Sequence, residues 1–125
     1  RGHTNGDAVI FFPARRAIHT GDLMAGGMLV DYANGGSAKE WAATLDGILK
    51  NDFDMVIPGH GNVSNKAGLV TQRGNVEKIR TRVAQLIREG KTKEDVGKAL
   101  TSEFGWDPNG LPMRAGLDGM MTELK

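Results

Sequence analysis

Three short loops rich in glycine, each beside a strand-like apolar run, constrain the fold of this chain most strongly. The first loop is G-H-T-N-G-D at Gly2–Asp7, the second is T-G-D-L at Thr20–Leu23, and the third is P-G-H-G at Pro58–Gly61. Glycine lets the backbone turn sharply, and residues in a loop beside a strand lie at the edge of a sheet. The pattern therefore predicts that these loops share one accessible edge.

Each loop carries one side chain that can bind a metal, namely His3, Asp22 or His60. Imidazole nitrogens and carboxylate oxygens are common ligands of zinc and similar metals. Taken singly, each residue has a plainer explanation, because a histidine beside glycine is usually a turn residue and an aspartate after Thr-Gly is usually a cap. The three loops together favour a shared site, with the side chains within about 4–8 Å of one another, as two neighbouring metals require.

The three loops resemble the C-terminal half of the metallo-β-lactamase-fold hydrolases, such as the glyoxalase II-like members. In that family the first loop supplies a metal-binding histidine, T-G-D-L supplies an aspartate that bridges two metals, and P-G-H-G supplies the last histidine. The resemblance is close over residues 1–69 and less specific over the helical residues 70–125. It implies an α/β fold, half of a four-layer αββα sandwich with a C-terminal helical extension.

The resemblance also implies a metal-dependent hydrolase, in which a metal-bridged hydroxide attacks an ester, thioester, lactone or amide of a small-molecule substrate. The parent enzyme would bind two divalent metal ions, either zinc or alternatively iron or manganese. His3 would bind one metal and His60 the other, while Asp22 would bridge both and so be the catalytic residue. The residues expected to hold these ligands in place are Thr4, Asp7 and Thr20.

The sequence departs from the family in one important respect. The chain has three histidines, and none belongs to the hallmark motif H-x-H-x-D-H. Each metal would receive two ligands from this chain, whereas catalytic zinc takes three from its protein. We therefore expect a fragment of a longer enzyme that is inactive alone and binds metal weakly or not at all. The alternatives are a non-catalytic, self-associating module and a nucleic-acid-processing member of the same fold.

Composition narrows the classes of function. The chain has no cysteine, which excludes disulfides and zinc–thiolate sites. The formal net charge of +1 gives no general reason to expect nucleic acid or membranes as partners. The basic residues of segment 75–93 are diluted by Glu77 and Glu89, so they favour a solvated helix face over a nucleic-acid surface. No apolar run approaches the roughly 20 residues of a membrane span, and we expect a soluble protein, cytoplasmic or periplasmic.

Hydrophobic periodicity predicts the order of the elements. A strand hairpin is followed by a helix and a further strand, which together form a βαβ-type unit, and the remainder is helical. Ser37-x-x-Glu40 predicts a capping box at the first helix, and Thr92-x-x-Asp95 predicts a second one. The predicted strands are 7–12, 17–20 and 54–57, and the predicted helices begin at Ser37, Asn65, Thr92 and Leu111.

Half of a sandwich leaves one face of its sheet without a covering layer. We expect alternate residues of 9–12, 17–19 and 55–57 to form an apolar face, and such a face is rarely left open on a monomer. A second copy related by a two-fold axis would cover it, so the sequence predicts a homodimer. The rival expectation is that the C-terminal helices fold over this face and keep the chain monomeric.

Overall fold

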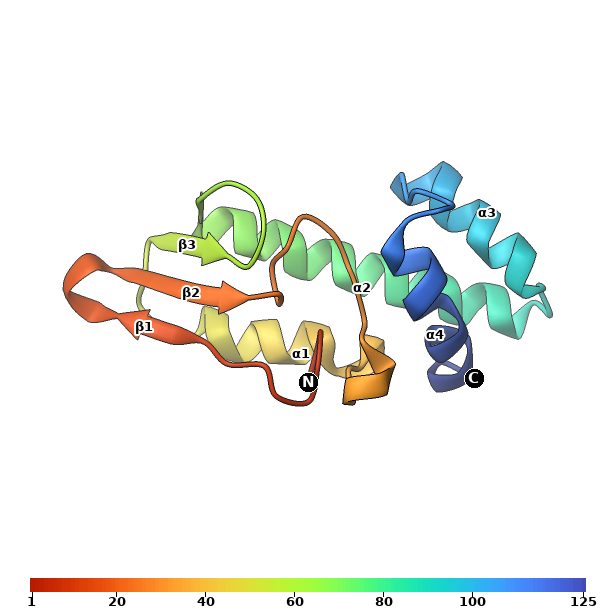
Figure 1. The fold of residues 1–125 in the computed structure, drawn as a ribbon, viewed down its shortest axis with the longest axis horizontal. Coiled ribbons are helices and arrows are strands. Elements are labelled where there is room, and N and C mark those ends of the chain that lie inside the picture. Colours follow the sequence, from red (N-terminus) through yellow and green to blue (C-terminus); the bar gives the residue numbers. More distant parts are fainter.

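A computed structural model describes residues 1–125 and shows one mixed sheet with helices packed along one of its faces (Figure 1). Strand β2 pairs with β1 in the antiparallel sense and with β3 in the parallel sense, and β4 adds an antiparallel edge. This arrangement confirms the α/β fold class expected from the sequence. The strands, in their order across the sheet, are β1 (Ile10–Phe12), β2 (Ala17–Gly21), β3 (Met55–Pro58) and β4 (Ser64–Asn65).

The hairpin between β1 and β2 is tied to the start of β3 through Arg16. A 3-10 turn at Pro13–Arg15 leads into Arg16, which has a left-handed backbone with φ of 49°. The Arg16 guanidinium donates to the carboxylates of Asp52 and Asp54, and its carbonyl accepts the N–H of Asp54. Hydrogen bonds from the guanidinium lower the pKa of both carboxyls. These bonds set the parallel register in which Ala17 lies opposite Met55.

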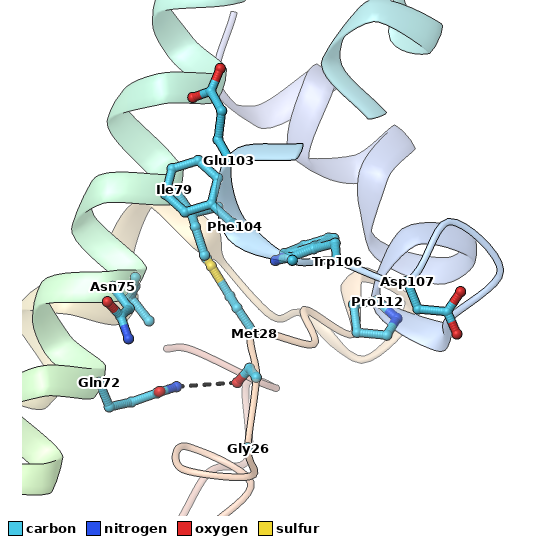
Figure 2. A pocket seen from close by; sticks show the side chains of 13 residues that line it. Gly26, Met28, Gln72, Asn75, Ile79, Glu103, Phe104, Trp106, Asp107 and Pro112 are labelled. Atoms are coloured by element: carbon cyan, nitrogen blue, oxygen red, sulfur yellow. Dashed lines mark hydrogen bonds between the residues drawn. The ribbon is translucent and has the colours of Figure 1, made fainter. Parts of the chain in front are cut away.

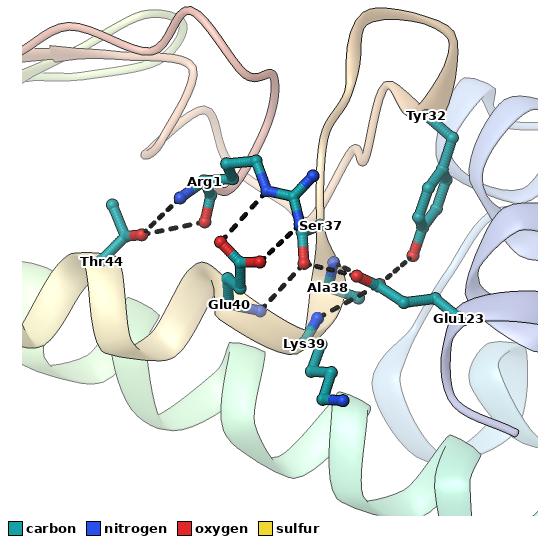
Figure 3. Close-up of polar contacts among 8 residues, drawn as sticks. All are labelled: Arg1, Tyr32, Ser37, Ala38, Lys39, Glu40, Thr44 and Glu123. Atoms are coloured by element: carbon teal, nitrogen blue, oxygen red, sulfur yellow. Dashed lines mark hydrogen bonds and ion pairs between the residues drawn. The ribbon is translucent and has the colours of Figure 1, made fainter.

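Helix α1 (Ala38–Leu49) makes the crossover between β2 and β3. Ser37 caps it as predicted, because its hydroxyl accepts the backbone N–H of Glu40. The other half of the predicted capping box is wrong. The Glu40 carboxylate pairs with the guanidinium of Arg1, a stronger charge-assisted partner (Figure 3). The Ser37 N–H instead donates to the carbonyl of Gly2.

The C-terminal part is helical, as expected. The helix expected from Asn65 onward is present, with Asn65 as its N-cap, and Thr92 and Asp95 form both hydrogen bonds of their predicted capping box. The last segment differs from the prediction, because a single π-type turn at Pro112–Gly116 precedes the helix and Pro112 has no N–H to donate. No helix combines the length and the hydropathy needed to cross a bilayer. The helices are α2 (Lys66–Arg88), α3 (Lys93–Phe104) and α4 (Leu117–Glu123).

One continuous apolar core lies between the sheet and the helices and extends along α2. Helices α1 and α2 cover the face of the sheet that carries Ile18 and Val56, and both of these side chains are fully buried. At the far end of α2, helices α3 and α4 close the core (Figure 1). The largest fully buried side chains are Trp41, Phe53, Ile18, Leu23, Leu45, Leu69, Leu100 and Met120.

The opposite face of the sheet is open. Ile10 and Phe12 share this face with His19 and Ala17, and Met55 lies beside Ala17. Ile10, Phe12 and Met55 are exposed by 56%, 43% and 45%. The C-terminal helices therefore do not fold over this face, and the rival expectation of an intramolecular cover is wrong.

Candidate metal centre

The three predicted loops meet at one edge of the sheet. Asp22 follows the end of β2 and His60 follows the end of β3, and the carboxyl ends of these parallel strands lie side by side. His3 reaches the same place from the N-terminal loop. His3 Nε2 lies 3.4 Å from Asp22 Oδ2, and His60 Nε2 lies 3.4 Å from Asp22 Oδ1. The structure thus brings the three side chains together, while their role as metal ligands remains a prediction.

Gly59 allows the second and third loops to approach this closely. Its N–H donates to the carbonyls of Gly21 at 2.8 Å and Met24 at 3.0 Å. A Cβ at position 59 would overlap Asp22 Oδ1 and lie 2.7 Å from the carbonyl carbon of Gly21. The sequence indicated the glycines of P-G-H-G only as turn residues. That Gly59 also gives the carboxylate of Asp22 its place was not predicted.

His3 is held in one orientation by a backbone carbonyl. Its Nδ1 lies 2.7 Å from the carbonyl oxygen of Leu29, which can only accept, so Nδ1 carries the proton. Nε2 is then the ring nitrogen that faces Asp22 and that a metal could bind. No sequence pattern indicated Leu29, because this contact joins residues 26 positions apart.

The two histidines differ strongly in exposure. The side chain of His3 is 16% exposed and that of Asp22 is 32% exposed, whereas that of His60 is 76% exposed. His3 and Asp22 are therefore fixed by the fold of this chain. His60 forms the open side of the site, where a further layer of protein could supply additional ligands.

The three residues expected to hold the ligands in place are Thr4, Asp7 and Thr20, and their hydrogen bonds stabilise the loop that carries His3 and the strand that precedes Asp22. Thr4 donates both its N–H and its hydroxyl to Asp7 Oδ1, at 2.9 and 2.8 Å, which closes the loop that carries His3. The other oxygen of Asp7 is buried without a hydrogen-bond partner. Thr20 of β2 is buried, with its hydroxyl 3.5 Å from the carbonyl oxygen of Ile57 in β3. None of the three hydrogen-bonds the side chain of His3, Asp22 or His60.

The donor set consists of two imidazole nitrogens on either side of one carboxylate. No group of three or more His, Cys, Asp or Glu side chains is arranged to hold a metal ion. Each histidine faces a different oxygen of Asp22. One imidazole nitrogen and one carboxylate oxygen would be available to each ion, fewer than the three protein ligands of catalytic zinc.

The site opens into a cavity of about 310 Å³. Its wall includes Leu29 from the loop after β2, and Leu111 and Pro112 from the C-terminal segment. The helical extension therefore contributes to the wall of the candidate site as well as to the core.

Among solved structures, this chain is similar to TMB-1, a metallo-β-lactamase whose structure was analysed for substrate and inhibitor binding. The TM-score is 0.53 and the sequence identity is 20%. The match covers 62% of this chain and 37% of TMB-1, so the chain spans well under half the length of that protein. At this identity the likeness shows the fold alone, which is that of part of a metallo-β-lactamase. No protein-family model and no curated protein matches the sequence.

Proposed function

We propose that this chain supplies His3, Asp22 and His60 to the two-metal centre of a metal-dependent hydrolase with the metallo-β-lactamase fold. One observation carries the proposal: the Nε2 atoms of both histidines lie 3.4 Å from opposite oxygens of one aspartate. The similarity to part of TMB-1 supports the superfamily. The remaining ligands would come from a segment bearing the H-x-H-x-D-H motif, which this sequence lacks.

The chemistry would be hydrolysis of an ester, thioester, lactone or amide. Divalent metal ions at such a site supply a nucleophile from water near neutral pH and stabilise negative charge on the carbonyl oxygen. The residues of this chain would set the geometry. Leu29 orients His3, and Gly59 holds the P-G-H-G loop against Asp22, so two of the ligands are placed before any metal binds.

Reconstitution tests this proposal. The chain would be mixed with the N-terminal segment of a metallo-β-lactamase-fold hydrolase that carries H-x-H-x-D-H, and metal content and hydrolysis of a generic ester would be measured. We expect tight metal binding and turnover that Asp22→Asn reduces at least about a hundredfold. Asp118→Asn, which neutralises an exposed carboxylate of α4 paired with Lys93 and distant from the sheet, is the matched control. Turnover that survives Asp22→Asn would contradict the proposal.

The open sheet face supports the second candidate function, a self-associating module. We infer that the isolated chain forms a two-fold homodimer through Ile10, Phe12 and Met55, which are exposed together on one face. Burying about 800 Å² on each partner would give an interface of ordinary size. The same face would receive the complementary half of the fold, so dimerisation and reconstitution should compete.

Light scattering at micromolar concentration tests the dimer. We expect twice the chain mass of 13.4 kDa, falling to a single mass in Ile10→Asp. The control is Val70→Asp, which charges a valine that is 53% exposed on α2, away from this face. A mass of 13.4 kDa for the unmodified chain would rule out the dimer. Val56 is unsuitable for this test because it is fully buried beneath α1 and α2.

The nucleic-acid alternative gains little support from the structure. Arg80 pairs with Glu77 on the same helix, and Arg82 pairs with Glu103 of α3. These pairs neutralise much of the basic stripe that the sequence places on α2, and a polyanion surface needs unpaired cations.

A further inference from the structure

A second cavity, of about 500 Å³, lies next to the candidate metal centre. It is formed between α2, the end of α3 and the loop after β2. Gly26, Gly27 and Pro112 line both this cavity and the one that contains His3, Asp22 and His60, so the two are neighbours across a thin wall. Its size is within the range of small-molecule sites, which is about 300–1,000 Å³.

The apolar part of the wall of this second cavity is formed by five of its 13 lining residues, namely Met28, Val76, Ile79, Phe104 and Trp106. Figure 2 shows the Met28 side chain extending between Ile79 of α2 and the Phe104–Trp106 segment that ends α3. Met28 and Ile79 are buried, whereas Phe104 and Trp106 are only half-buried and so offer surface that a ligand could cover. Pro112 closes the side nearest the metal centre.

Polar groups on the wall can bind a neutral ligand. The side chain of Gln72 is already used, because its Nε2 donates to the carbonyl of Gly27 at 3.1 Å. The Asn75 carboxamide and the Trp106 indole N–H make no hydrogen bond in the structure (Figure 2). Both can donate to a carbonyl or hydroxyl oxygen of a ligand.

The charges on the wall disfavour anions. The ionisable residues that line the cavity are Glu103 and Asp107, and no lysine, arginine or histidine lines it. Glu103 is paired with Arg82, which neutralises it, while Asp107 accepts a hydrogen bond only from the backbone N–H of Asn109. An anionic ligand would lose its hydration here without gaining a cationic partner.

We propose that this cavity binds a neutral, largely apolar group of the substrate, such as an aryl or branched-alkyl group, and thereby selects uncharged esters, lactones or amides over anionic ones. The inference rests on the hydrolase function proposed above, because it assigns the cavity to a substrate whose carbonyl lies across Gly26 and Gly27 at the metal centre. The helical extension then has a binding role, since α3 supplies Phe104 and the segment after it supplies Trp106.

Binding of phenylacetamide and phenylacetate to the metal-free chain tests the proposal. The two probes have nearly the same shape and differ in charge. Binding would be followed through the NMR signals of the two indole N–H groups. Trp106 should respond, whereas Trp41 is fully buried, donates to the carbonyl of Leu23, and should not. Trp106→Phe assigns the two signals.

We expect phenylacetamide to shift the Trp106 signal saturably and to bind at least about tenfold more tightly than phenylacetate. Asn75→Lys, at an exposed position of α2, should reverse this preference by adding a cation to the wall. Lys78→Asn, on the same helix but outside the cavity, is the control and should leave it unchanged. No saturable response at Trp106, equal affinity for the two probes, or no reversal in Asn75→Lys would each overturn the proposal.

This test is independent of metal and turnover. A chain that binds phenylacetamide at Trp106 but gives an inactive reconstituted complex would refute the hydrolase function and leave the ligand site standing. An active complex whose Trp106 signal ignores both probes would refute the ligand site alone.

Discussion

Gly59 has no side chain, and this lets the two central loops pack closely. Its own N–H bonds to Gly21 and Met24 hold the P-G-H-G loop in place, and the Asp22 carboxylate occupies the space that a side chain at 59 would need. The geometry of the candidate site therefore depends on residue 59 having no Cβ. Gly59 directly precedes His60, which the sequence did indicate as a candidate ligand.

We predict that Gly59→Ala destabilises the chain by about 1–3 kcal/mol, because its Cβ meets backbone and the Asp22 carboxylate, neither of which can move freely. Urea unfolding measures this. The matched control is Gly47→Ala in the last turn of α1, where a Cβ meets nothing within 4 Å. That change should stabilise by about 0.5–1 kcal/mol. Equal effects of the two substitutions would show that loop packing at 59 is not tight.

Tyr32 makes a second close contact, with the carboxylate of Glu123. Burial raises the pKa of its phenol, and the Glu123 carboxylate, which accepts a hydrogen bond from the phenol O–H at 2.8 Å, raises that pKa further. Because the pKa of the phenol is higher in the folded state, the neutral Tyr32 contributes to stability. This contribution is complete below about pH 10, the usual pKa of a phenol, and is lost as the pH rises through the higher pKa of the folded state.

Tyr32 is the only tyrosine, so absorbance of the phenolate on alkaline titration measures this pKa directly. We expect a midpoint above the usual value, and a lower midpoint in Glu123→Gln that still exceeds it because burial remains. An unshifted midpoint in the unmodified chain would mean that the phenol is not held against Glu123.

At the scale of elements, α4 is fastened to the N-terminus of α1 by one carboxylate. Glu123 accepts hydrogen bonds from the Ser37 hydroxyl, the Ala38 N–H and the Tyr32 hydroxyl (Figure 3). A negative charge at this end of a helix also interacts favourably with the helix dipole. The fold thereby joins its last helix to its first one.

Glu123→Ala should cost about 2 kcal/mol of stability, since charge-assisted hydrogen bonds contribute about 1.5–3 kcal/mol and neighbouring donors lose their partner. Hydrogen exchange should show α4 opening before the sheet. Glu94→Ala, which removes an exposed carboxylate paired only with Lys98 on α3, is the control and should change stability by less than about 0.5 kcal/mol. Unchanged protection of α4 in Glu123→Ala would argue against this role.

The elements themselves were largely predictable. Short apolar runs bounded by turn residues identified the first three strands, and the caps at Ser37 and Thr92 were correct because a cap is a local interaction. The short strand β4 and the π-type turn at Pro112–Gly116 were not predicted, because each depends on tertiary contacts. The convergence of His3, Asp22 and His60 was predictable from strand ends, whereas the contacts of Leu29, Gly59 and Glu123 required the folded chain.

At the scale of the whole molecule, helices cover one face of the sheet and leave the other open. Under the proposed function, a further layer of protein would cover both the exposed His60 and the exposed apolar residues Ile10, Phe12 and Met55. An added layer would complete both the core and the ligand set. We therefore expect metal affinity and coverage of the sheet to increase together.

Titration of the isolated chain with Zn²⁺, followed through the imidazole NMR signals, tests the central claim most directly. The chain has three histidines, so every signal can be assigned. We predict weak binding that shifts His3 and His60 together, leaves His19 unchanged and disappears in Asp22→Asn. Complete structural zinc sites bind their metal with an apparent free energy of about 10–16 kcal/mol. Binding to this chain should be far weaker, because ligands are missing. Shifts at His19 alone, or binding that survives Asp22→Asn, would contradict the claim.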